Sequence, residues 1–129
     1  MILLDTHVLV WAGLARRKLS RVAESAIRRA EARGGLAISA VSLLELARLI
    51  AADRIERRGT VRETIDSLTA GVLVFPITAE IAALTAYLPA DFPSDPADQT
   101  IAATAQAEAI PLVTADERLQ SSPLVKTIW

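Results

Sequence analysis

The sequence contains no cysteine and only one histidine among its 129 residues. The absence of cysteine excludes disulfides, thiolate nucleophiles and cysteine-based zinc sites, and it is typical of a cytosolic protein. The single histidine, His7, is too few for a histidine-rich metal site and argues against a histidine-based catalytic triad. Any chemistry that the chain performs is therefore expected to depend on other polar side chains.

Aromatic residues and long apolar runs are also scarce. Aromatic side chains make up 4% of the chain, so platforms on which single-stranded bases can stack are few. No apolar run reaches the roughly 20 residues that span a membrane. Residues 1–5 (MILLD) lack the basic segment and cleavage site of a signal peptide. We therefore expect a cytoplasmic protein without a membrane span.

Charge is unevenly distributed along the chain, although its net value is only −1. Residues 1–62 contain 12 of the 14 lysines and arginines but only 6 of the 15 acidic residues, a balance of +6. Residues 63–129 contain 2 basic and 9 acidic residues, a balance of −7. This asymmetry indicates a basic face beside an acidic site, with ordinary charged solvent faces of helices as the alternative.

Short apolar segments alternate with helical patterns along the chain, whose length fits one domain. Apolar periodicity and capping residues predict helices that begin near residues 7, 20, 41, 60, 78 and 96. This alternation favours a parallel sheet covered by helices on both faces. The expected strands are residues 2–4, 36–39, 72–75 and 111–114, with 125–128 as a candidate fifth.

Four acidic residues occupy matching places in this pattern. Asp5 follows the first expected strand and Asp116 follows the fourth, so both lie at the carboxyl edge of the sheet. Ligand sites in parallel sheets lie beyond that edge. Glu45 lies inside an apolar helical run, and Asp98 lies in the first turn of a helix. The pattern thus predicts that the four carboxylates meet.

Each acid also has an ordinary structural explanation. The two acids at strand ends can cap the helices that follow them. Glu45 can pair with Arg48 on the same helix, and Asp98 can complement a helix dipole. Asp95, which precedes Pro96, has the sequence context of a helix N-cap.

A cluster of carboxylates needs a compensating charge, because carboxylates that lie close together repel each other and one would otherwise take up a proton. No basic residue neighbours Asp5, Asp95 or Asp98 in the sequence, so a metal ion is the expected compensation. Oxygen ligands favour Mg²⁺ or Mn²⁺, and such an ion can activate a water as nucleophile toward phosphorus. Thr6 and Thr114 are placed to hydrogen-bond the carboxylates.

Four segments resemble, in order, the motifs of PIN-domain ribonucleases, specifically the VapC-type toxins of bacterial type II toxin–antitoxin pairs. The resemblance covers nearly the whole chain, and the combined spacing is specific although each motif alone is weak. The segments are residues 1–11 (MILLDTHVLVW), 38–47 (ISAVSLLELA), 95–105 (DPADQTIAATA) and 112–116 (LVTAD).

The resemblance implies a fold and an activity. The fold is a single PIN domain over residues 1–129, a three-layer α/β/α sandwich with a mainly parallel sheet of four to five strands. The activity is that of a Mg²⁺-dependent endoribonuclease, with Mn²⁺ as a substitute, which hydrolyses RNA phosphodiester bonds. By motif position the catalytic acids are Asp5, Glu45, Asp98 and Asp116; Asp5, Asp98 and Asp116 are the expected metal ligands, with Glu45 and Asp95 as further candidates.

The resemblance also implies partners. A cognate antitoxin inhibits such toxins, and we expect a homodimer that joins the antitoxin in a larger complex. The apolar faces of residues 20–33 and 41–58, including Leu49, Ile50 and Ile55, are expected to form a groove for an antitoxin helix. We expect RNA phosphates to contact one of two basic clusters, which contain Arg16, Arg17, Lys18 and Arg21, and Arg54, Arg57 and Arg58.

The sequence favours two other classes of function less strongly. A receiver domain or an aspartyl phosphatase would need a second acid near Asp5, and the phosphatase motif would place it at His7. The other alternative is a PIN-fold module that binds RNA or an antitoxin without catalysis.

One position departs from the family motif. Gln99 stands where family members often carry Arg or Lys, which weakens the case for a phosphate contact there.

Overall fold

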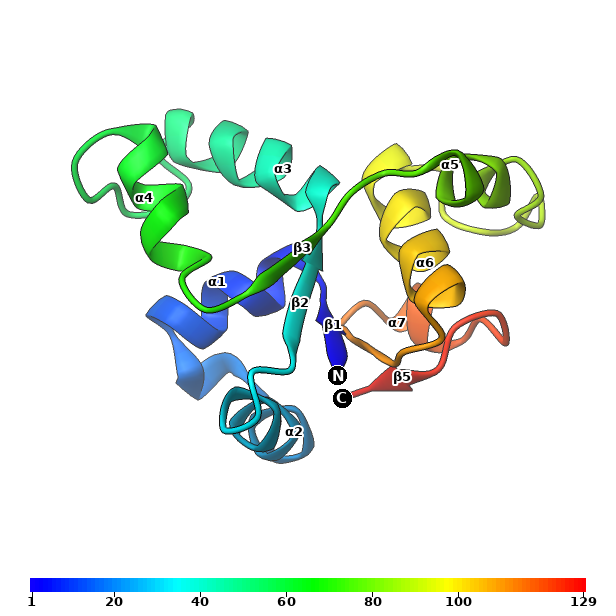
Figure 1. The fold of residues 1–129 in the computed structure, drawn as a ribbon, viewed down its shortest axis with the longest axis horizontal. Helices are drawn as coiled ribbons and strands as arrows, with labels where there is room; N and C mark the ends of the chain where they lie inside the picture. The colour runs from blue at the N-terminus through cyan, green and yellow to red at the C-terminus, as the bar shows by residue number, and fades with distance from the viewer.

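The computed structural model describes residues 1–129 and contains a parallel sheet of five strands between two layers of helices (Figure 1). The strand order across the sheet is β3-β2-β1-β4-β5, and every neighbouring pair is parallel. The strands are short and comprise β1 (Ile2–Leu4), β2 (Leu36–Ser39), β3 (Leu73–Phe75), β4 (Leu112–Val113) and β5 (Thr127–Ile128).

Seven α-helices and one 3₁₀ helix connect these strands. The helices α1 to α4 pack against one core cluster, whereas α6 and α7 contribute to a second cluster on the opposite face, with α5 packed on α6. Their bounds are α1 (Thr6–Leu14), η1 (Arg16–Lys18), α2 (Arg21–Glu31), α3 (Ala40–Ala51), α4 (Val61–Leu68), α5 (Ala79–Thr85), α6 (Pro96–Glu108) and α7 (Glu117–Gln120).

The central strand β1 shows why both faces of the sheet are covered. Ile2 and Leu4 belong to the core cluster beneath α1 to α3, whereas Leu3 belongs to the cluster beneath α6. Successive strand residues point to opposite faces, so an apolar strand needs a helical layer on each side. The three side chains are buried, which fixes the position of the residue that follows them, Asp5.

The order in which the chain adds strands to the sheet reverses between β1 and β4. The chain adds β2 and β3 on one side of β1, and then crosses to add β4 and β5 on the other side. Loops that leave neighbouring strands in opposite directions at such a point open a crevice at the carboxyl edge. Asp5 and Thr114 are the first residues beyond these two strands.

Most of the expected elements are confirmed, and the differences have local causes. The expected helices form with side-chain caps at Ser20, Thr60, Thr78 and Asp95. The strands β1 and β2 have the expected bounds, whereas β3, β4 and β5 are shorter than expected. Leu73 is 47% exposed because β3 is an edge strand. The short helices η1 and α7 were not expected. No helix is both long and apolar enough to cross a membrane.

The expected apolar groove on residues 20–33 and 41–58 is wrong in part. The helix α3 ends at Ala51, and the segment beyond it forms a turn that leads toward α4. Ile50 and Ile55 are buried in the core cluster, so they are not free to contact a partner. Leu49 is only partly buried.

Candidate active site

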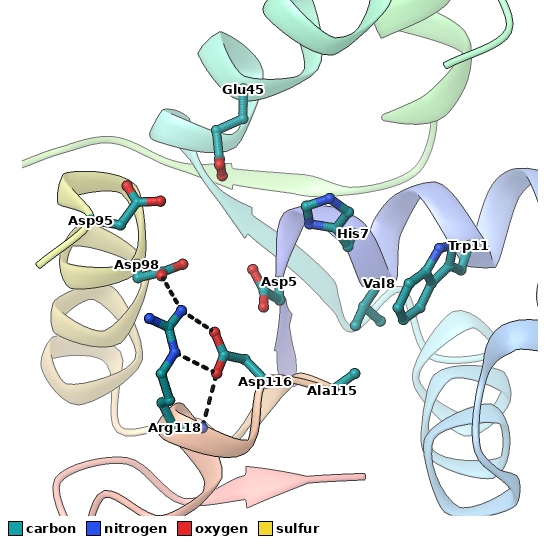
Figure 2. A pocket seen from close by; sticks show the side chains of 10 residues that line it. All are labelled: Asp5, His7, Val8, Trp11, Glu45, Asp95, Asp98, Ala115, Asp116 and Arg118. Carbon is teal, nitrogen blue, oxygen red and sulfur yellow. Dashed lines mark hydrogen bonds and ion pairs between the residues drawn. The ribbon is translucent and has the colours of Figure 1, made fainter. Parts of the chain in front are cut away.

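The acidic residues predicted from the sequence lie around one pocket of about 410 Å³ (Figure 2). They come from four parts of the chain that converge at the carboxyl edge of β1 and β4. The lining residues are Asp5, His7, Val8, Trp11, Glu45, Asp95, Asp98, Ala115, Asp116 and Arg118.

Asp5 is fixed through both of its carboxylate oxygens. Its Oδ1 accepts a hydrogen bond from the backbone N–H of Thr6 at 2.9 Å, which caps α1. Its Oδ2 accepts a hydrogen bond from Thr114 Oγ1 at 2.7 Å. Burial raises the pKa of Asp5 above its ordinary value, although these two hydrogen bonds oppose the shift. The carboxylate is therefore oriented before any ligand arrives.

Glu45 is held by a buried pair of hydroxyls. Thr6 Oγ1 donates to Glu45 Oε1 at 2.5 Å and lies 2.8 Å from Ser42 Oγ. Because the single proton of Thr6 Oγ1 goes to Glu45, Ser42 must be the donor in the second hydrogen bond. Burial raises the pKa of Glu45, with smaller contributions from neighbouring carboxylates. Glu45 makes no ion pair with Arg48, so the alternative explanation for this residue is wrong.

Asp95 and Asp98 both belong to the start of α6. Asp95 Oδ1 accepts from the backbone N–H of Ala97 at 2.9 Å, which confirms its role as N-cap. Asp98 lies in the first turn, and burial together with the neighbouring carboxylates raises its pKa to about 7. The positive end of the helix dipole favours anions at this position, but it does not cancel the excess negative charge.

Asp116 is paired with an arginine that sequence reasoning missed. Its carboxylate accepts from the backbone N–H of Arg118 at 2.9 Å and from Arg118 Nη2 at 2.9 Å. These hydrogen bonds lower the pKa of Asp116. The same Nη2 lies 3.7 Å from Asp98 Oδ2, so one guanidinium bridges two acids (Figure 2).

The donor set of the pocket fits a hard divalent cation. Five carboxylates line the pocket, and Arg118 is the only lysine or arginine among the lining residues. No three acidic side chains lie close enough to enclose a metal ion. Mg²⁺ commonly binds through only one or two carboxylates and keeps several waters, so it does not need a closed cage. The raised pKa of Asp98 reflects the negative charge that such a cation would neutralise.

The basic residues expected to contact RNA do not line this pocket. Arg16 forms ion pairs with Glu24 and Glu31 at 3.0 Å each, so its charge is engaged within the chain. Lys18 lies with its Nζ 6.0 Å from the ring centroid of Trp11, which does line the pocket. The other five expected residues are exposed, namely Arg17, Arg21, Arg54, Arg57 and Arg58.

Two further polar residues of the site were not identified from the sequence, and both carry a local signal. Arg118 stands two residues after Asp116, where a helix start folds its side chain back onto the cap. Ser42 stands three residues before Glu45, one turn away on the same face of α3. Gln99 is not placed for the phosphate contact that family members make at this position, because its Nε2 donates to the backbone oxygen of Pro93.

Comparisons with known proteins identify a matching family and a similar curated protein. Residues 2–122 match the family model of the PIN domain. The chain is 39% identical to Ribonuclease VapC22 of Mycobacterium tuberculosis, over 99% of this chain and 98% of that protein.

Two solved structures share the fold. One is VapBC2 from Rickettsia felis bound to a promoter DNA fragment, with a TM-score of 0.74 and 19% identity over 98% of this chain and 97% of that one. The other is a toxin–antitoxin complex from Klebsiella pneumoniae, with a TM-score of 0.66 and 21% identity over 97% of this chain and 95% of that one.

Proposed function

The chain belongs to the PIN-domain family, and on this basis we propose that it is a metal-dependent endoribonuclease, the toxin of a VapBC-type pair. The observation that carries the proposal is the meeting of five carboxylates in one pocket at the edge of the sheet. Whole-chain similarity to a ribonuclease supports catalysis over the alternative of a binding module without catalysis. The favoured cation is Mg²⁺, with Mn²⁺ as a substitute.

In this proposal Asp5, Asp98 and Asp116 hold the cation, one or two of them directly and the others through its bound waters, with Glu45 and Asp95 as further candidates. A bound divalent cation stabilises negative charge that develops on phosphorus oxygens and makes water a better nucleophile at neutral pH. The chain supplies orientation. Thr114 and the start of α1 hold Asp5, while Thr6 holds Glu45 on the opposite wall.

Arg118 has a distinct part in the proposed mechanism. Its side chain is 66% exposed while its guanidinium contacts Asp116 and Asp98. A cation held by these acids would compete with the guanidinium for them, which leaves Arg118 free to donate to a phosphate of the RNA. The fixed fork of an arginine suits bidentate contact with phosphate oxygens.

The proposal predicts RNA cleavage that requires a divalent cation. The antitoxin-free protein is incubated with a panel of structured and unstructured RNAs in Mg²⁺, in Mn²⁺ and in EDTA. We expect internal cleavage with either cation and none in EDTA. RNA binding without cleavage at any metal concentration would favour the binding-module alternative instead.

The raised pKa of Asp98 predicts how metal and pH affect stability. Between its ordinary value near 4 and about 7, folded Asp98 retains a proton that the unfolded chain has lost. Stability of the metal-free protein therefore falls as the pH rises through this window. Mg²⁺ binds the ionised site and removes this penalty, so it raises the Tm more at pH 8 than at pH 5.

Differential scanning fluorimetry with EDTA or Mg²⁺ measures this effect. The matched control is Asp98→Asn, which keeps the shape of the side chain and removes its titration. In this variant, the Mg²⁺-induced increase in Tm is expected to be nearly the same at pH 5 and pH 8. A Mg²⁺ shift of the same size at pH 5 and pH 8 in the unmodified protein contradicts the assignment of Asp98.

The proposal includes an antitoxin and a homodimer as partners, in the cytoplasm. The solved complex from Klebsiella pneumoniae, which has this fold, is described as a toxin–antitoxin complex. On the present chain Val22 of α2 and Leu44 of α3 are each 58% exposed, although both are large and apolar. They lie on the two helices that the sequence assigns to the antitoxin groove, and they replace the buried Ile50 and Ile55 as candidates for that contact.

A further inference from the structure

One wall of the acidic pocket is aromatic. His7 and Trp11 both line the pocket, with ring centroids 6.2 Å apart. Figure 2 shows them on α1, across the pocket from Asp95 and Asp98. The ring of Trp129 lies 6.0 Å from that of Trp11, and Lys18 Nζ lies 6.0 Å from the centroid of the Trp11 ring.

This grouping is not expected from the composition. The chain has two tryptophans, one tyrosine and two phenylalanines, and both tryptophans are in this cluster. His7 and Trp11 lie four residues apart on α1, so they share one face of that helix. The segment that positions Asp5 thus also positions two rings beside it.

The hydrophobic core does not account for the whole cluster. Trp11 and Trp129 pack against the core beneath α1, but each is only partly buried, and His7 is exposed. The exposed imidazole and the partly exposed indole are tilted by 53° to each other, so each presents its own flat, polarisable ring at the edge of an acidic pocket. The faces of nucleic acid bases stack on such surfaces.

We propose that His7 and Trp11 form a stacking wall for an unpaired nucleobase next to the phosphodiester that is cleaved. This inference rests on the proposed ribonuclease function, and it adds which side chains contact the base beside the cleaved bond. Trp129 is a positioning residue that supports the Trp11 ring. Lys18 lies at the same ring, where its ammonium can contact an adjacent phosphate.

A stacking wall would favour unpaired RNA without reading base identity. A base inside a duplex has both faces covered by its neighbours, whereas an unpaired base can present a face to the protein. Every base has such a face, so stacking tolerates different sequences. The phosphate next to the stacked base would then lie over the carboxylates, since His7 and Asp5 border the same pocket.

Binding is measured with a fluorescein-labelled single-stranded decanucleotide RNA in Mg²⁺, using the Asp5→Asn background to prevent cleavage. We expect His7→Ala and Trp11→Leu each to weaken binding about tenfold or more, from the stacking energy of one base. Trp11→Phe keeps a ring and retains most of the affinity. Tyr87→Ala is the matched control, because Tyr87 is an aromatic residue that is 84% exposed outside the pocket.

Intrinsic fluorescence gives a second readout that does not depend on cleavage. Trp129→Phe leaves Trp11 as the single tryptophan, and a stacked base is expected to quench its emission. Mg²⁺ affinity, measured by calorimetry, is expected to be unchanged in His7→Ala and Trp11→Leu. In the active background these substitutions raise KM more than they lower kcat, and thermal melts establish that each variant is folded.

The outcomes separate this inference from the proposed function. If the unmodified protein cleaves RNA but His7→Ala and Trp11→Leu bind it normally and Trp11 is not quenched, the stacking wall is wrong and the ribonuclease stands. If RNA quenches Trp11 and both substitutions weaken binding while no RNA is cleaved, the wall is supported and the ribonuclease is wrong. Equal affinity for the decanucleotide and its duplex also overturns the wall.

Discussion

Replacing Asp5 with asparagine lowers the rate of RNA cleavage by about a thousandfold or more. Asp5 is the proposed cation ligand at the end of the central strand, and both of its oxygens are already oriented by hydrogen bonds. Cation stabilisation of a reacting phosphate contributes several kcal/mol to the barrier, and each 1.36 kcal/mol corresponds to about tenfold in rate. Single-turnover cleavage in Mg²⁺ measures the loss.

The fold is expected to survive this substitution. Asparagine is as good an N-cap as aspartate, so its side-chain oxygen can still accept from the backbone N–H of Thr6. Asp53→Asn is the matched control, because Asp53 is exposed outside the pocket and asparagine tolerates its positive φ of 55°. Cleavage by Asp5→Asn within tenfold of the unmodified protein would exclude Asp5 as an essential ligand.

Replacing Thr114 with valine is expected to damage both stability and activity. Thr114 is fully buried, donates to Asp5 and accepts from the backbone N–H of Asp116. Valine has nearly the same shape but leaves both partners without this hydroxyl. An unpaired buried polar group costs about 1–3 kcal/mol of stability, and loss of a group that orients a metal ligand commonly costs about 10–100-fold in metal affinity or activity.

Thr114→Ser tests whether the hydroxyl is responsible. Serine keeps the donor and acceptor and removes only a methyl group, so it retains most of the activity. Urea denaturation and Mg²⁺ titration of both variants separate the effect on folding from that on the site. The assignment is contradicted if Thr114→Val binds Mg²⁺ as tightly as the unmodified protein. It is also contradicted if Thr114→Ser and Thr114→Val lose the same amount of Mg²⁺ affinity.

Local signals explain why most of the fold could be predicted from the sequence. A helix start depends on one capping side chain and a few following residues, so Ser20, Thr60 and Thr78 identified three helices directly. Buried strands in a parallel sheet are short continuous apolar runs, which located β1 and β2. The turn α7 has only four residues and no periodic pattern, so no local rule distinguishes it from a loop.

The acidic residues of the candidate site that come shortly after a buried strand could be predicted from the sequence. Asp5 and Asp116 are each found by asking which polar residue follows a buried strand, and the structure places both in the pocket. Helix capping and pocket lining are not alternatives for these two residues, because each residue does both. A carboxylate has about four lone-pair sites and helix capping uses one of them, so a capping aspartate can still bind a ligand.

Contacts between distant segments limited the rest of the prediction. The hydroxyl pair of Thr6 and Ser42 joins residues 36 positions apart, and nothing near either residue indicates it. A low aromatic content indicated few stacking platforms, but composition says nothing about where rings gather. Trp129, the last residue of the chain, reaches Trp11 only because β5 lies in the same sheet as β1.

Because the acids also cap helices, few substitutions at these positions can remove the activity and keep the fold stable. Asp5, Asp95 and Asp116 each begin a helix, so exchange for alanine costs about 0.5–2 kcal/mol as well as charge. Exchange for asparagine removes the charge and keeps the cap, and a single base change converts either aspartate codon to an asparagine codon. Under the proposed toxin function, copies with asparagine at these positions are therefore expected to fold and to bind the antitoxin without cleaving RNA.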